Sequence, residues 1–148
     1  MSLVSAVALL ALSGCGGSLE PGEVAGNYRL TTIDAQALPV LIYATIECDE
    51  RVTDGALTLS ATGGFVLRYA TELACAGNPD AGGREREFAG IFSLSGRRVL
   101  FNGAEGSGQR VHFEGESRGS GFLVLLPDNV AELTRELELG FEPAIERD

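Results

Sequence analysis

The sequence has few of the residues that most often carry catalysis or bind metals. Its 148 residues include one His, three Cys and no Trp, and the eleven basic residues are all Arg. The single His112 leaves little material for acid–base chemistry, although carboxylates can take that role. With no close-spaced pair of Cys to join it, His112 also cannot complete a zinc site. We therefore expect a protein that is not an enzyme and that holds no metal or other cofactor.

Positive charge is also scarce. Eleven basic residues stand against 21 acidic ones, which gives a formal net charge of −10. Such a surface repels nucleic acids and anionic lipid headgroups. We therefore expect no nucleic-acid partner and no binding of the globular part to a lipid surface.

Long apolar runs are missing except at the N-terminus. Residues 4–12 form an apolar stretch that is shorter than the roughly 20 residues of a transmembrane helix and suits the hydrophobic region of a signal peptide. The tetrapeptide Leu12-Ser13-Gly14-Cys15 that closes the stretch resembles the lipobox of bacterial lipoprotein signal peptides. The alternative interpretation is a buried N-terminal strand or helix.

The lipobox resemblance implies that residues 1–14 are a cleaved signal peptide and that Cys15 becomes the lipidated N-terminus. Two or more acyl chains, palmitate for example, suffice for stable attachment to a membrane. Gly16 is not an acidic inner-membrane retention signal, so the resemblance implies a protein of the outer membrane that faces the periplasm or the cell surface. Residues 15–23 are rich in Gly, Ser, Glu and Pro and are predicted to form a flexible linker.

With Cys15 assigned to lipid, Cys48 and Cys75 remain as a pair. An exported protein lies in an oxidising compartment, where disulfides persist. We therefore expect a Cys48–Cys75 disulfide, which contributes about 3–4 kcal/mol in the chain-entropy model. The alternative is two buried free thiols.

The chain beyond residue 23 consists of short segments of strand-like alternation that are broken by Gly, Asn, Asp and Pro. About eight or nine such segments, joined mostly by tight turns, predict an all-β fold. Because no long crossover separates them, we expect an antiparallel up-and-down β-barrel of about eight strands over residues 24–142. Residues 122–126 are apolar on both faces, which predicts a strand that is covered twice. Residues 128–137 fit a short helix and 135–141 a strand, of which we favour the strand; residues 143–148 are predicted to be a disordered tail.

Several hairpin motifs resemble those of small lipocalin-like domains of secreted bacterial proteins: Gly26-Asn27-Tyr28-Arg29-Leu30, Leu38-Pro39, residues 55–59, Gly63-Gly64-Phe65 and residues 90–94. Lipocalins carry Gly-x-Trp in the first strand, with a basic residue packed over the indole. Here Tyr28 stands in place of the Trp, and the resemblance implies that Arg135 packs over it and closes one end of the barrel. The alternative is that Arg135 lies on the solvent-exposed face of a helix. The same alternation gives a set of inward-facing residues that line a ligand cavity or fill the core: Tyr28, Leu57, Leu59, Phe65, Leu67, Tyr69, Phe92, Val99, Phe101, Val111, Phe113 and Phe122.

Other motifs predict no chemistry. Residues 115–119 match the Gly-x-Ser-x-Gly nucleophile elbow, but the segment after them favours a strand over the required helix, which indicates a hairpin turn. His112 alternates out of phase with the inward residues and is expected to face solvent. The acidic residues around 47–54 do not follow a calcium-loop order, and residues 103–108 lack the Lys of a phosphate-binding loop. These segments are interpreted as a solvated loop and a flexible hairpin connection.

Two functions remain open. The first is a lipid-anchored envelope barrel that binds a small hydrophobic ligand. The second is a non-catalytic accessory module that contacts another envelope protein, with the loop at residues 75–83 as the place of contact, because functional contacts favour loops on rigid scaffolds.

Overall fold

The computed structural model describes residues 19–130 and 133–145. The expected signal peptide (residues 1–14), the lipidated Cys15 and residues 146–148 of the expected tail lie outside the described residues. The described elements are α1 (Pro21–Val24), β1 (Gly26–Ile33), β2 (Gln36–Ala37), β3 (Val40–Ala44), β4 (Cys48–Leu59), β5 (Gly64–Cys75), β6 (Gly83–Ser95), β7 (Arg98–Glu105), β8 (Arg110–Arg118), β9 (Gly121–Leu126) and β10 (Leu137–Pro143). None of the described residues belongs to a helix long and apolar enough to cross a membrane.

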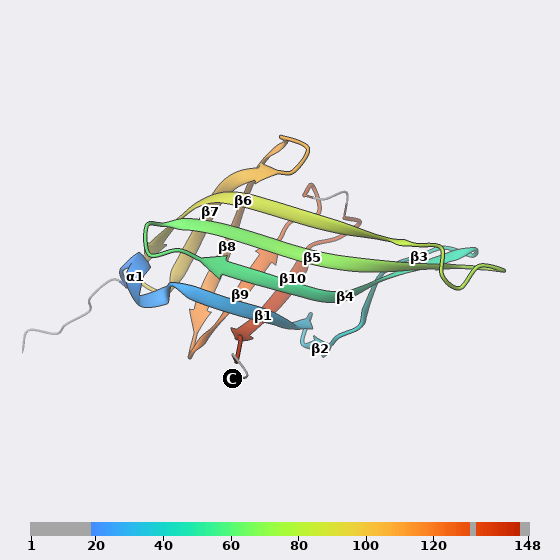
Figure 1. Cartoon of the computed structure of the whole chain (residues 1–148), viewed down its shortest axis with the longest axis horizontal. Helices are drawn as coiled ribbons and strands as arrows, with labels where there is room; N and C mark the ends of the chain where they lie inside the picture. Colours follow the sequence, from blue (N-terminus) through green and yellow to red (C-terminus); the bar gives the residue numbers. More distant parts are fainter. Residues whose placement is uncertain (1–18, 131–132, 146–148) are drawn as a thin grey trace, which may run out of the picture.

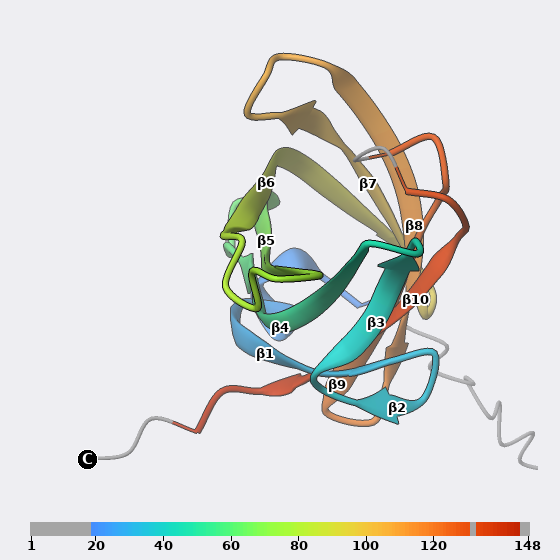
Figure 2. The same ribbon diagram turned by 90° about the vertical axis from the view of Figure 1, so that its right-hand side faces the viewer.

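The strands form a closed antiparallel barrel (Figures 1 and 2). From β4 to β10 each strand pairs with the next along the chain, and β1 closes the barrel by pairing with both β10 and β4. Eight strands therefore make the barrel, while β2 and β3 extend the ends of the sheet. This confirms the prediction of an up-and-down barrel of about eight strands.

The barrel interior is packed with side chains. All twelve residues expected to face inward are buried, at 9% exposure or less. Their aromatic rings touch one another: the Phe101 and Phe113 centroids lie 4.9 Å apart, and those of Phe65 and Phe101 lie 5.0 Å apart. Full burial of an aliphatic or Phe side chain contributes roughly 1.5–3 kcal/mol. The set therefore serves as a core, and it leaves no room for a lipid along the barrel axis.

One end of the barrel is closed by α1. Pro21 stands in the first helical turn, where its missing N–H costs no hydrogen bond. The hydroxyl of Tyr28 donates to the carbonyl of Val24 at 2.8 Å, and the Val24 side chain is buried in the core. Ordered structure therefore begins within the segment that was expected to be linker.

At the opposite end β4, β5 and β6 run past the barrel and form a projecting arm together with β3 (Figure 1). We define the arm as β3, the first half of β4, the last half of β5 and the start of β6. The predicted Cys48–Cys75 disulfide is confirmed, and it joins directly opposed residues of β4 and β5 near the tip of the arm. Within the arm, β4 contains a bulge between Val52 and Asp54.

Two expectations about the surface are wrong. The strand at Phe122–Leu126 is covered on one side only: Phe122, Val124 and Leu126 are buried, whereas Leu125 is 36% exposed, because the barrel has a single layer. The connection expected at residues 103–108 begins later, since β7 continues to Glu105 before the turn.

In the tail the favoured strand is present as β10, and the described residues between β9 and β10 contain no helix.

The expected contact of Arg135 with Tyr28 is also wrong. β10 runs antiparallel to β1, so Tyr28 pairs with Pro143 at the far end of β10, whereas Arg135 precedes its first residue, Leu137. Arg135 instead forms an ion pair with Asp34 in the turn after β1. Tyr28 packs edge-on against Phe122, with ring centroids 4.9 Å apart.

Candidate functional site

Five polar side chains collect where the arm leaves the barrel, at the end opposite α1. Strand alternation explains why they face inward. Thr71 continues the inward row of Leu67 and Tyr69 on β5, and the burial pattern of β5 alternates without interruption. The other four, from β4, β6 and β7, are Glu50, Arg84, Arg86 and Glu105. We call these five residues the mouth cluster.

The alternation of β6 and β7 places three members of the mouth cluster. Arg84 and Arg86 lie in phase with buried Phe88, four and two positions before it respectively. Glu105 lies in phase with buried Phe101. The inward direction of Glu50 has another cause: the bulge after Val52 shifts the alternation of β4 by one residue. Without that bulge, the inward phase of Leu57 would point Glu50 to the outside.

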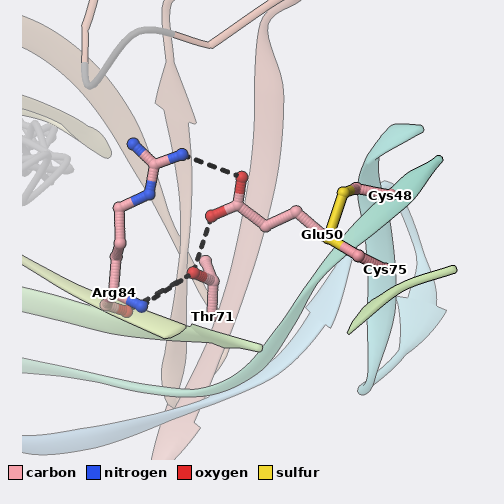
Figure 3. A network of polar contacts seen from close by, with 5 residues as sticks. All are labelled: Cys48, Glu50, Thr71, Cys75 and Arg84. Atoms are coloured by element: carbon pink, nitrogen blue, oxygen red, sulfur yellow. Dashed lines mark hydrogen bonds and ion pairs between the residues drawn. A yellow bond between two sulfur atoms is a disulfide. The ribbon is translucent and has the colours of Figure 1, made fainter. Parts of the chain in front are cut away.

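Glu50, Thr71 and Arg84 form one half of the mouth cluster (Figure 3). The Thr71 hydroxyl donates to Oε1 of Glu50 at 2.7 Å, and Nη2 of Arg84 lies 3.4 Å from Oε2 of the same carboxylate. The backbone N–H of Arg84 donates to the Thr71 hydroxyl at 3.3 Å. Glu50 is only 9% exposed, so both of its oxygens are held by protein groups in a largely desolvated place.

Arg86 and Glu105 form the other half. Nη1 of Arg86 lies 2.5 Å from Oε1 of Glu105, and their side chains are 19% and 8% exposed. Desolvating such a pair costs several kcal/mol per ion, and the attraction within the pair often only balances that cost. We therefore do not assign this ion pair a large contribution to the stability of the fold. Buried charged groups of this kind are common at functional sites.

Tyr69 marks the floor of the mouth cluster. Its ring stacks on Phe88 of the core, with centroids 6.3 Å apart. Burial raises the pKa of Tyr69 to about 12, with the cluster carboxylates adding to the rise and the two guanidinium groups opposing it. The hydroxyl therefore stays protonated at neutral pH and is available as a hydrogen-bond donor.

A cavity of about 220 Å³ lies above this floor. Its polar wall comes from Tyr69 and from four members of the mouth cluster, all except Glu105. Its apolar wall includes Ile42 and Tyr43 of β3 and Leu133 of the segment before β10. Pockets for drug-sized ligands span roughly 300–1,000 Å³, so this cavity suits a small molecule. Three further hollows among the described residues are open grooves on the outside of the barrel, and a fourth open groove adjoins the mouth cluster at Arg84, Arg86 and Glu105.

The sequence-predicted site residues are distributed unevenly about this cavity. Tyr69 alone of the twelve inward residues lines it, while the others fill the interior below. The mouth cluster was not predicted as a site. The signal for Arg84 and Arg86 was present, because the alternation from Phe88 to Phe92 extends backward through both. No sequence pattern indicated that Glu50 faces inward, because the bulge in β4 that turns it inward has no recognisable sequence motif.

The remaining motifs lie on the outer surface. His112 is exposed, and its Nδ1 lies 2.7 Å from the side-chain oxygen of Asn102. Residues 115–119 end β8 and begin the turn to β9, as the hairpin interpretation predicts. The residues 75–83 form an exposed loop at the tip of the arm, where Cys75 and Asn78 bridge. The acidic segment belongs to β4 rather than to a loop, with Glu50 buried.

Chemically, the site offers a protonated phenol, the carboxylate of Glu50 and two guanidinium groups around a small space with an apolar wall. The carboxylate of Glu105 lies behind them, paired with Arg86. These groups can hydrogen-bond or ion-pair with a polar head, and the wall of Ile42 and Leu133 can cover a short apolar part. Among the described residues, no cluster of three or more His, Cys, Asp or Glu side chains is arranged to hold a metal ion.

No protein-family model matches the chain, and neither a curated protein nor a solved structure matches it.

Proposed function

We propose that the protein is an envelope lipoprotein, attached to the membrane through Cys15, whose barrel binds a small amphipathic ligand at its mouth. The observation that carries the ligand proposal is the 220 Å³ cavity with buried polar side chains, Glu50, Thr71 and Tyr69, on one wall and apolar side chains on the other. Buried ionic groups at a concave site are typical of functional sites.

The attachment proposal fits the orientation of the barrel. Only residues 16–18 separate Cys15 from Leu19, which packs against the core beside α1. The segment is too short to cross the molecule, so a lipid on Cys15 would lie near the α1 end. The arm, whose strands carry most of the cavity lining, lies at the end opposite α1 (Figure 1). The mouth would therefore face away from the membrane, toward the periplasm or the outside of the cell.

The ligand differs from the one that the lipocalin resemblance implies. Phe65, Phe88, Phe101 and Phe113 fill the space where an acyl chain would lie. The ligand therefore has a short apolar part, which rests on Ile42 and Leu133. Its head is polar and meets the mouth cluster and the Tyr69 hydroxyl.

Tyrosine fluorescence can test the ligand proposal, because the chain has no Trp and two of its three Tyr, Tyr43 and Tyr69, line the cavity. The probes are hexanoate, hexanol and hexylamine, which share an apolar part and differ in head group. We expect at least one to change the fluorescence saturably with a Kd between about 10 μM and about 1 mM, the range open to so small a ligand.

Two variants separate specific from nonspecific binding. Ile42→Phe narrows the cavity and should abolish binding, and Thr71→Val, which removes a polar group from the wall, should weaken it about tenfold. Thr58→Val is the matched control, because Thr58 is exposed on the outer face of β4. The ligand proposal is overturned if no probe binds, or if Ile42→Phe binds as the wild type does. The attachment proposal is overturned if palmitate labelling of cells persists in Cys15→Ser.

A further inference from the structure

The polar groups around the cavity are mostly hydrogen-bond donors. The guanidinium groups of Arg84 and Arg86 line it, and a guanidinium donates but cannot accept. Among the described residues that line the cavity, Glu50 is the one side chain that can only accept. A ligand head that fits this wall is therefore one that accepts hydrogen bonds.

The carboxylate of Glu50 is already turned toward protein donors. Its Oε1 accepts from the Thr71 hydroxyl at 2.7 Å, and its Oε2 lies 3.4 Å from Nη2 of Arg84. A cationic head that approached Glu50 would meet the like charge of Arg84 beside it. The Thr71 hydroxyl gives its only proton to Glu50, so it offers no further donor.

The arginines can hold a ligand oxygen together with their protein partners. Both take part in contacts within the protein, but each guanidinium carries five N–H donors in a planar fork. The Arg84 side chain is 55% exposed, and its 3.4 Å contact with Glu50 is longer than an ordinary hydrogen bond. The fork of an arginine matches the two oxygens of a carboxylate.

Strand pairing places the phenol of Tyr69 beside one of these guanidinium groups. Tyr69 and Arg86 are directly opposed across β5 and β6, and opposed side chains on one face of a sheet are neighbours. Burial raises the pKa of Tyr69 to about 12, so its hydroxyl keeps a proton to donate at neutral pH. The floor and the wall of the cavity thus present donors to the same small space.

Charge also favours an anion at this place. Two guanidinium groups and one carboxylate line the cavity, and Glu105 lies behind Arg86. The lining is therefore net positive in a protein whose net charge is −10.

We propose that the head group of the ligand is a carboxylate, bound by the guanidinium groups of Arg84 and Arg86 and by the hydroxyl of Tyr69. The inference rests on the proposed function and names its ligand class, a short aliphatic monocarboxylate whose apolar part lies on Ile42 and Leu133. A neutral head is bound less tightly, because hydrogen bonds to an ionised group are roughly twice as strong as neutral ones.

The head-group preference of the wild-type protein is the first test. Tyrosine fluorescence of the full chain at neutral pH is titrated with hexanoate, hexanol and hexylamine. We expect the Kd of hexanoate to be about tenfold below that of hexanol and hexylamine to bind most weakly. Hexanol or hexylamine binding as tightly as hexanoate overturns the carboxylate inference and leaves the ligand proposal standing. Absence of binding by all three overturns both.

Removing one guanidinium is the second test. Arg84→Met keeps the aliphatic part of the side chain, so it should raise the Kd of hexanoate about tenfold and change that of hexanol less than about twofold. Arg98→Met is the matched control, because Arg98 pairs with Glu114 on the outer surface, and it should change neither value. An Arg84→Met protein that keeps the wild-type ratio of the two Kd values overturns the inference.

Removing the competing carboxylate gives a change of opposite sign. Glu50→Gln keeps the shape of the side chain and deletes its negative charge, so the ratio of the hexanol Kd to the hexanoate Kd should rise about threefold. A ratio is insensitive to damage that weakens both probes alike, so this variant decides the question even if Arg84→Met fails to fold. A ratio that stays constant or falls in Glu50→Gln overturns the inference.

Discussion

Tyr69 is the residue at which the packed interior meets the polar mouth. Its ring belongs to the core, stacked on Phe88, while its hydroxyl lies among the charges of the mouth cluster. The sequence placed Tyr69 correctly on the inward face of its strand, in phase with Phe65 and Leu67. Its polar surroundings were not predicted, because they come from strands distant in sequence.

Alkaline titration tests this placement. Because burial raises the folded pKa of Tyr69 to about 12, above the unfolded value of about 10, the folded state disfavours tyrosinate. The contribution of Tyr69 to stability is therefore complete below pH ~10 and is lost as the pH rises toward ~12. We expect the free energy of unfolding in urea to fall over this range, and tyrosinate absorbance to show a late step.

Tyr69→Phe is the control for this prediction. It removes the late absorbance step and flattens the decline in stability above pH ~10. A late step that persists in Tyr69→Phe would assign the high pKa to another tyrosine. Tyr28 is the alternative source, because burial raises its pKa as well.

At the scale of elements, the arm depends on the covalent bond between β4 and β5. Cys48 and Cys75 are directly opposed, and Glu50 and Thr71 lie two and four residues inward of them on the same two strands. The disulfide thus holds β4 and β5 together close to Glu50 and Thr71 of the mouth cluster.

Removing the disulfide should destabilise the protein substantially. The cysteines are 27 positions apart, and closing a loop of that size contributes about 3–4 kcal/mol in the chain-entropy model. We expect Cys48→Ala/Cys75→Ala to lose about this much free energy of unfolding, measured in urea. Wild-type protein unfolded with a reductant present should match the double variant. A loss below about 1 kcal/mol would indicate that the reduced chain already holds the two strands together.

The sequence predicted the strands of the barrel better than the arm. Clean alternation, as in residues 56–60 and 65–69, identifies strands because each is half buried by its neighbours. The lengths of β4 and β5 were missed, since polar residues such as Glu50 and Thr71 interrupt the apolar pattern. The ion pair of Arg135 was missed because it depends on how β1 and β10 align where the barrel closes. Their antiparallel pairing places Arg135 beside Asp34.

For the whole molecule, added salt has two opposite effects on the stability of the folded state: it weakens the repulsion due to the net charge, and it weakens the attraction within ion pairs. The ion pairs on the outer surface are mostly exposed; Arg98 and Glu114, for example, are 58% and 43% exposed. Pairs of this kind contribute about 0–1 kcal/mol each. The net charge of −10 acts against the compact state throughout.

We therefore expect the melting temperature to rise with salt. Raising sodium chloride from about 10 mM to about 500 mM shortens the screening length from ~30 Å to a few Å, which removes most long-range repulsion. Calorimetry at low micromolar protein measures the effect. A melting temperature that falls with salt would mean that the exposed ion pairs outweigh the net charge.

The seam between β1 and β10 has a consequence for how the chain reaches this fold. β1 is the first strand of the barrel to be synthesised and β10 is the last, and the amide of Glu138 bonds the carboxylate of Asp34 across 104 positions. A growing chain can add hairpins from β4 onward, but it keeps two open sheet edges until its final residues arrive. Contacts of such long range slow folding, and open edges invite aggregation. The nascent protein is therefore most vulnerable in the interval before its last strand closes the ring.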